Sequence, residues 1–213
     1  MRKTKAEALQ TRQDLLLSAL NVFYQHGVAR AFLNEIARNA GVTRGALYWH
    51  FKNKEDLFDA LFQLIFQDIS QELERDINEH TIHPKDNLRQ ALINMFVRLQ
   101  HNDMHYKFCN ILYLKCEHTA QNQAIIALSQ KYHIMWEEQL MRALQVCVTQ
   151  NDLPADLDIA KATLTMHISL KGLMSMWLHH HLDNMDLSLV AHQFIDIALD
   201  TLSTHPALRQ ATT

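Results

Sequence analysis

The sequence predicts an all-α protein, with an N-terminal head of three helices that contains a helix-turn-helix and a body of about six further helices. Glycine and proline, which mark turns and strand-rich folds, number only four and three among 213 residues. Three of the glycines fall within the first 45 residues, so the rest of the chain has few points at which a helix must stop. Apolar residues recur at helical spacing along most of the chain.

The charge differs sharply between the two parts. Residues 1–54 carry nine basic and three acidic residues, a net charge of +6, whereas residues 55–213 carry eleven and twenty, a net charge of −9. A basic head on an acidic body indicates that only the head binds a polyanion. We therefore expect two domains, 1–54 and 55–213.

The helices can be placed in order. A first helix over residues 5–25 carries leucines at helical spacing and stops at Gly27. A short helix over 33–40 follows, and Thr43 opens a second short helix as its N-cap. Asn53 can cap a longer helix that runs to about residue 79. The remaining helical segments are predicted near residues 87–100, 104–117, 123–150, 158–178 and 187–203.

The sequence also bears on the compartment. No apolar run approaches the 18 or more residues that a membrane span needs, and no apolar stretch follows the charged first residues as in a signal peptide. The three cysteines, Cys109, Cys116 and Cys147, are expected to be buried thiols rather than a redox switch. Both observations predict a cytoplasmic protein.

The segment from Leu33 to Phe51 has the pattern of a helix-turn-helix. Gly41 supplies the left-handed conformation that a tight turn between two helices needs, and Ala37 is small where the helices come closest. The predicted core between the two short helices consists of Ile36, Ala37, Ala40, Val42, Leu47 and Phe51.

Several residues of the second short helix lie outside this core and are expected to face DNA. The second helix of such a motif enters the major groove with its N-terminal residues nearest the bases. Arg44 can then reach a guanine edge, and Gly45 permits close approach. An ordinary helical hairpin with a solvated basic face would leave Tyr48 and Trp49 unexplained. The expected DNA-binding residues are Lys5, Asn34, Thr43, Arg44, Gly45, Tyr48, Trp49, His50 and Lys54.

At these positions the chain strongly resembles the TetR family of bacterial repressors, whose signature is EIA..AGVT.G.LY.HF..K..L. The resemblance is densest in the first 60 residues, and it looks closest to the AcrR and MtrR type that represses multidrug efflux-pump operons. The matching positions are Glu35-Ile36-Ala37, Ala40-Gly41-Val42-Thr43, Gly45, Leu47-Tyr48, His50-Phe51, Lys54 and Leu57, with further likeness at residues 2–5, 110–112, 114–119 and 152–153.

The resemblance implies a homodimer in which the last two helices of each chain form a four-helix bundle. The segments 158–178 and 187–203 are apolar on more than one face, which agrees with burial on two sides. The expected dimerisation residues are Ile168, Phe194, Ile195, Leu199 and Leu202.

The resemblance further implies a pocket in the body for a hydrophobic or amphiphilic effector. Taken singly, each methionine or aromatic residue there is more readily explained as core, but as a set they fit a pliable apolar cavity. The expected ligand-binding residues are Phe66, Met95, Phe108, Tyr113, Tyr132, His133, Trp136, Leu140, Met166, His167, Leu170, Lys171, Met174 and Trp177.

Two features of the body have open alternatives. Lys171, if buried, needs a partner such as Glu137 or an anionic group of the effector, or else it extends to water at the rim of the dimer. The run His179-His180-His181 could ligate a metal, but adjacent histidines on a helix point in different directions, so a solvated loop is favoured.

These patterns together predict a ligand-responsive repressor that binds double-stranded operator DNA, controls a multidrug efflux operon, and needs no metal or cofactor. A regulator of a metabolic operon with the same fold is the alternative. An enzyme is disfavoured because the sequence has no glycine-rich phosphate loop, no HExxH spacing and no nucleophile elbow. An architectural DNA-binding protein would not need the separate acidic body.

Overall fold

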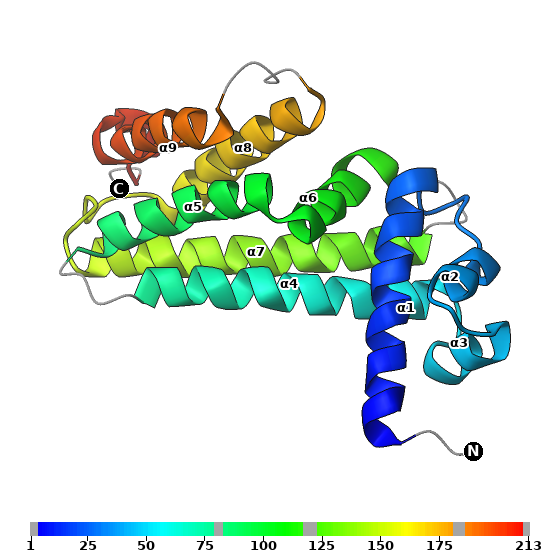
Figure 1. Cartoon of the computed structure of the whole chain (residues 1–213). Helices are drawn as coiled ribbons and strands as arrows, with labels where there is room; N and C mark the ends of the chain where they lie inside the picture. The colour runs from blue at the N-terminus through cyan, green and yellow to red at the C-terminus, as the bar shows by residue number, and fades with distance from the viewer. Residues whose placement is uncertain (1–3, 79–82, 117–122, 181–185, 211–213) are drawn as a thin grey trace. The chain divides into compact units, whose positions relative to one another are not determined.

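The computed structural model describes residues 4–78, 83–116, 123–180 and 186–210, which form nine α-helices, one π-helical turn and one 3-10 turn, with no strand (Figure 1). None of these helices combines the length and the apolar composition that a membrane span requires. The elements are α1 (Lys5–His26), α2 (Leu33–Asn39), α3 (Arg44–His50), α4 (Lys54–Asn78), α5 (Pro84–His101), α6 (Asp103–Asn110), η1 (Ile111–Lys115), α7 (Gln123–Thr149), α8 (Ile159–Leu178), α9 (Leu187–Thr204) and η3 (Pro206–Leu208).

The predicted all-α fold is confirmed, and polar caps explain where many helices begin. The Thr4 hydroxyl accepts a hydrogen bond from the Glu7 backbone N–H, and the Glu7 carboxylate accepts one from the Thr4 N–H. Asn53 Oδ1 accepts from Asp56 N at 2.8 Å and so caps α4. Asp158 and Asp186 cap α8 and α9 in the same way.

The predicted helix over 104–117 is instead two elements, α6 and the π-helical turn η1, and residues 117–122 lie outside the described ranges. Contacts with α1 and with Val28, which follows α1, hold this turn. Lys115 Nζ donates to the carbonyl of Tyr24 and lies 4.4 Å from the centre of the Tyr24 ring. The Lys115 carbonyl accepts from Val28 N at 3.2 Å. A π-helix is rare and occurs mostly as a single turn of this kind next to an α-helix.

The chain divides into two compact units, residues 1–67 with 103–131, and residues 68–102 with 132–213. In the first unit α1 packs against α2, α6 and η1, and α2 packs against α3. Its core contains several aromatic side chains. Phe58 contacts both Phe23 and Phe62, at distances of 5.6 and 4.9 Å between ring centres. The boundary predicted at residue 54 separates a DNA-binding part from a ligand-binding part. It divides the chain by function, whereas the two units are defined by packing, so it stays a prediction.

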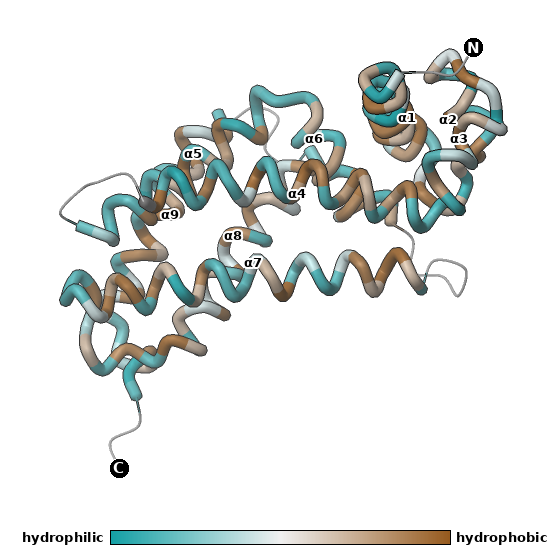
Figure 2. The backbone as a smooth tube through the Cα atoms, turned by 90° about the horizontal axis from the view of Figure 1, so that it is seen from below, coloured by the Kyte–Doolittle hydropathy of each residue, from teal (hydrophilic) through white to brown (hydrophobic). Residues whose placement is uncertain are grey.

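In the second unit α9 packs along α5 and against α8. Its helices are amphipathic, and Figure 2 shows hydrophobic and hydrophilic residues alternating along α7 and along the part of α4 that belongs here. The part of α4 in this unit is tied to α5 by a buried carboxylate: Asp76 accepts hydrogen bonds from Arg98 at 2.8 Å and Asn94 at 3.2 Å. Arg98 also pairs with Glu72.

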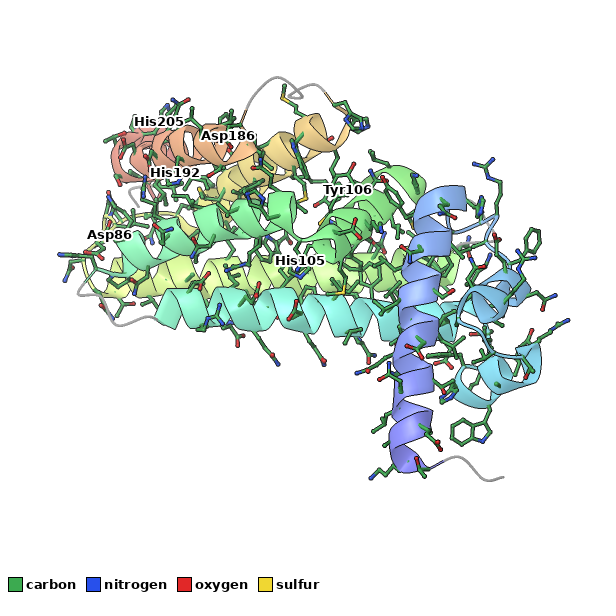
Figure 3. All side chains as sticks on the ribbon, in the orientation of Figure 1. Asp86, His105, Tyr106, Asp186, His192 and His205 are labelled. Atoms are coloured by element: carbon green, nitrogen blue, oxygen red, sulfur yellow. The ribbon has the colours of Figure 1, made fainter. Side chains whose placement is uncertain are left out.

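A bidentate ion pair joins α5 to α9. Two of the guanidinium nitrogens of Arg89, Nε and Nη2, donate to the carboxylate of Asp196, the second at 2.9 Å. The hydrogen bond from Arg89 lowers the pKa of Asp196, with a smaller contribution from the charge of His192 on the same helix. The same hydrogen bond raises the pKa of Arg89, and the charge of Asp86 on α5 adds to this effect. Figure 3 labels Asp86 on α5 and His192 on α9.

This pair makes a pH-dependent contribution to stability. Because the folded-state pKa of Asp196 is depressed, the contribution is present above the ordinary pKa of about 3.9 and is lost as the pH falls through the folded-state value. We expect Asp196→Asn to lower the free energy of unfolding by about 0.5 to 1 kcal/mol at pH 7. Urea unfolding should show the difference shrinking below pH 4. A difference that stays constant with pH would contradict this account.

The cysteines agree with the sequence-based expectation in part. Cys109 and Cys147 are buried free thiols, and burial raises the pKa of each to about 12. Thiolate is therefore scarce at neutral pH, so neither thiol is poised for redox chemistry. Cys116 forms no disulfide either, but it is only half-buried.

Candidate nucleic-acid interface

The position of α3 is fixed by its apolar side and by its two ends. Leu47 and Phe51 are buried, as are Ile36 and Ala37 of α2, whereas the predicted core residues Ala40 and Val42 are only half-buried. Gly41 has a φ of 68°, so the turn between the helices needs the left-handed conformation that was expected of it. The Thr43 hydroxyl caps α3 by accepting from Ala46 N at 3.2 Å.

The opposite side of α3 presents a cation and aromatic rings to solvent. Arg44 Cζ lies 5.3 Å from the centre of the Tyr48 ring, and Arg44 Nη2 lies 3.3 Å from the Tyr48 hydroxyl. Trp49 is 74% exposed, and its ring meets the edge of His50 at a centroid distance of 4.6 Å. An exposed guanidinium held on a ring is already oriented, which lowers the conformational entropy lost on binding.

Gly45 is exposed in the first turn of α3, and its surroundings do not require a glycine. A Cβ at this position would meet only Thr43 Oγ1, at 3.9 Å. Glycine in a helix interior costs roughly 0.5 to 1 kcal/mol relative to alanine, and the contacts around Gly45 give no reason for a glycine in this first turn. Close approach to another molecule is such a reason.

The remaining predicted DNA-binding residues differ in position. Lys5 begins α1, Asn34 lies in the first turn of α2, and both are exposed. Arg12 of α1 lies over the Phe51 ring, with its Cζ 5.3 Å from the ring centre, and so connects α1 to the end of α3. The Ser18 hydroxyl donates to the Ile36 carbonyl at 2.8 Å, which ties α2 to α1.

The contacts of Lys54 contradict the sequence-based expectation that this side chain binds phosphate. Its Nζ donates to the carbonyls of Val28 and Ala29 at 2.9 Å and to that of Ala31 at 3.4 Å. Burial lowers the pKa of Lys54, an effect that the charge of Glu55 opposes. All three ammonium protons are used inside the chain, so Lys54 holds the segment between α1 and α2 instead of facing a ligand.

Phe32 was missed by the sequence-based prediction. It occupies the N-cap position of α2, makes no side-chain cap hydrogen bond and is 72% exposed. The signal in the sequence was the absence of Ser, Thr, Asp or Asn before a helix that otherwise fits the motif.

The predicted effector-binding residues of the first unit lie on α4, α6 and η1. Phe108 is buried with its ring edge against Phe62 at 4.6 Å, and Phe66 is half-buried. Burial raises the pKa of the Tyr113 hydroxyl, so this group is neutral at physiological pH.

In the second unit the predicted residues divide by burial. The buried side chains are Tyr132, Leu140, Met166 and Leu170, and the half-buried ones are Met95, His133, Trp136, His167, Met174 and Trp177. The polar members form a group between α7 and α8. The rings of His133 and His167 are stacked at 6.0 Å, and His167 Nδ1 lies 2.8 Å from a carboxylate oxygen of Glu137.

Lys171 is exposed, so the idea of a buried ammonium that faces the effector is wrong. Glu137, which was considered as its partner, contacts His167 instead. Lys171 lies one turn after Ile168 on α8, next to the exposed Gly172. This position fits the alternative in which Lys171 extends to water beside a partner subunit. His179 and His180 are exposed at the end of α8, and His181 lies outside the described residues.

An exposed apolar face covers parts of α8 and α9. Leu164, Ile168 and Met176 follow one another at intervals of four or eight residues on α8, and Leu189, Phe194 and Ile197 are exposed on α9. Ile168 and Phe194 were expected here. Ile195, Leu199 and Leu202 were expected here as well, but they are buried inside the chain. They occupy the side of α9 that packs within its own unit, so their assignment to a dimer surface is wrong.

Comparisons with known proteins give a consistent result. Residues 15–61 match the family described as bacterial regulatory proteins of the tetR family, and residues 83–204 match the C-terminal region of MAATS-type transcriptional repressors. The HTH-type transcriptional regulator AcrR of Shigella flexneri is 34% identical over 213 residues, which cover 100% of this chain and 98% of that protein. The HTH-type transcriptional regulator TtgR of Pseudomonas putida is 34% identical over 99% of this chain and 100% of that protein.

A solved structure is similar over nearly the same length. The complex of SmeT with triclosan has a TM-score of 0.81 and 28% sequence identity, covering 95% of this chain and 96% of that chain. Another structure of SmeT is described as that of the repressor of the Stenotrophomonas maltophilia multidrug efflux pump SmeDEF.

Proposed function

The chain belongs to the TetR family of bacterial regulatory proteins, and from this premise we propose that it works as a homodimer whose two α3 helices enter the major groove of an operator. The resemblance found in the helix-turn-helix residues is thereby confirmed, and the protein is a transcriptional repressor rather than an enzyme. As a bacterial repressor it would meet its operator in the cytoplasm.

One observation carries the placement of α3. The side of α3 away from the core carries Arg44 stacked on Tyr48 and the exposed Trp49. It also carries Gly45, which no contact inside the chain requires. Arginine paired with guanine is the commonest specific contact in the major groove, and a missing Cβ lets the backbone approach the DNA. Tyr48, Trp49 and His50 would contact sugar and phosphate.

The DNA target can be found without knowing its sequence. Purified protein would be mixed with fragments of the genome that encodes it, and the retained fragments would be sequenced. We expect a short pseudo-palindromic operator, because a two-fold symmetric dimer reads two half-sites. Retention of all fragments in proportion to their length would contradict the proposal. Genes beside the operator would distinguish an efflux operon from a metabolic one.

Replacement of Arg44 gives a sharper test. We expect Arg44→Ala to weaken operator binding by about 1 to 3 kcal/mol and to relax the preference for the base that Arg44 reads. Affinity would be measured by fluorescence anisotropy at matched salt, with the operator and with variants of each half-site. Arg38→Ala, which removes an exposed arginine from α2, is the matched control. If Arg44→Ala and wild type discriminated bases equally, α3 would not read the groove as proposed.

The exposed face of α8 and α9 supports the homodimer. Monomeric proteins rarely leave an apolar patch of this kind uncovered, and a two-fold axis would pair the patch with its own copy. Gly172 lies in the middle of α8 on this side, and a Cβ there would meet no atom within 4 Å. Because Gly172 has no Cβ, the α8 helix of the partner could approach closely at this point.

We further propose that a hydrophobic or amphiphilic effector releases the operator and is anchored in the body by the group of His133, His167 and Glu137. This group offers both hydrogen-bond donors and an acceptor among half-buried aromatic side chains. Because SmeT is described in complex with triclosan, this compound is the first probe. By linkage, an effector that lowers operator affinity binds the free protein more tightly than the DNA-bound protein by the same factor.

Calorimetry would test the effector site. Triclosan binding would be measured for wild type, His167→Phe and Lys171→Met, with and without operator. Loss of binding in His167→Phe alone supports the anchor. Equal binding by all three proteins would remove His167 from the site, and equal affinity with and without operator would contradict release by the effector.

An efflux operon is proposed because SmeT is described as the repressor of a multidrug efflux pump.

A further inference from the structure

Phe32 is unusual in two respects for a residue at the start of a helix. The residue before a helix is normally Ser, Thr, Asn or Asp, whose oxygen satisfies an N–H group of the first turn, and Phe32 at the start of α2 provides no such bond. Its ring is also 72% exposed to water. A residue that stabilises neither the helix nor the core is a candidate for a binding role.

The surroundings of Phe32 favour a polyanion. Arg30 and Asn34, two residues before and after it, are exposed. Glu35 carries the one carboxylate in the sequence between Asp14 and Glu55, and it lies 3.3 Å from Nε2 of His26 on α1. The start of α2 therefore presents an aromatic ring, a guanidinium and an amide.

We propose that the Phe32 ring packs against deoxyribose carbons of the operator backbone and so positions the head on DNA. This inference rests on the proposed placement of α3, because in a helix-turn-helix with its second helix in the major groove the first helix crosses the backbone. The sugar carbons between phosphates offer an apolar surface that a ring can cover. The contact adds affinity without reading bases, since every nucleotide carries the same sugar.

A contact of this kind has its own signature. Loss of a phosphate contact flattens the dependence of affinity on salt, whereas loss of an apolar contact leaves that slope unchanged. Loss of a base contact weakens operator binding alone, whereas loss of a sugar contact weakens binding to every duplex. The expected result for Phe32→Ala is a loss of about 5- to 10-fold in affinity for the operator and for an unrelated duplex of equal length, at constant salt slope.

The experiment uses the full chain and the operator recovered by genomic selection. Phe32→Leu, which keeps apolar surface, should retain more affinity than Phe32→Ala. Leu17→Ala, which truncates an exposed apolar residue of α1, is the matched control and should bind as wild type does. Thermal unfolding should show equal midpoints for Phe32→Ala and wild type, because alanine adds no cap.

Three outcomes would overturn the inference: unchanged affinity in Phe32→Ala, a loss confined to the operator, or a changed salt slope. A failure of the wild type itself to prefer any duplex would instead contradict the proposed function. The two failures are therefore distinguishable within one titration series.

Discussion

A glutamate in place of Ile168 is expected to produce a monomer that no longer holds operator DNA. Ile168 is 62% exposed on α8, so the charge would disturb little within a single chain. In the proposed dimer the same carboxylate would lose water and face the apolar side chains of the partner's copy of this surface, at a cost of several kcal/mol. Two linked heads bind two half-sites with an effective concentration that a single head lacks, so operator affinity should fall by about 100-fold or more.

Light scattering would give the mass of the species in solution, and anisotropy would give its operator affinity. Ile134→Glu, at an equally apolar and 56% exposed position of α7, is the matched control and should remain dimeric. Gly172→Leu is an independent variant, because it adds bulk without charge where the helices are proposed to meet. A monomeric Ile168→Glu protein with full operator affinity would refute the link between assembly and DNA binding.

Replacement of Lys54 by methionine is expected to destabilise the first unit by about 1 to 3 kcal/mol. The methionine keeps most of the apolar stem but leaves the carbonyls of Val28, Ala29 and Ala31 without their donor. Urea unfolding, followed by the loss of the helical circular-dichroism signal, would measure the change. Lys52→Met, a change at an exposed neighbour, should have no such effect.

The same variant distinguishes an internal role from a phosphate contact. Below its melting temperature, Lys54→Met should bind operator with the salt slope of wild type, because the ammonium of Lys54 is already engaged inside the chain. Loss of a phosphate contact would lower the slope by about one. A lower slope with unchanged stability would show that Lys54 leaves its carbonyls when DNA binds.

Helix positions could be predicted from the sequence because their determinants are local. Thr43 and Asn53 cap the helices that they were expected to cap, and Gly41 has the positive φ that the turn needs. The core of the helix-turn-helix was readable for the same reason, since Ile36 and Leu47 are buried as the periodicity predicts.

The errors concern which partner a side chain finds. Lys54 meets carbonyls that precede it by 23 to 26 residues, and no spacing rule encodes such a contact. On α9, an apolar residue can face its own unit or a second subunit, and periodicity assigns Ile195 and Ile197 equally to either side. The two alternatives for Lys171, a buried ammonium or a side chain at the rim of the dimer, stayed open for a similar reason, because the apolar residues around it could be core or surface.

The contacts between α1 and η1 bear on how such repressors can be recombined. Tyr24 is held by Lys115 at its carbonyl and its ring, and it meets Tyr106 of α6 at a ring distance of 6.1 Å (Figure 3). A chimaera joined at residue 54 would therefore exchange one half of this interface without the other. Residues 1–67 and 103–131 form the compact unit that contains both halves of this interface, so we expect an exchange of operator specificity to succeed only when both stretches are exchanged together.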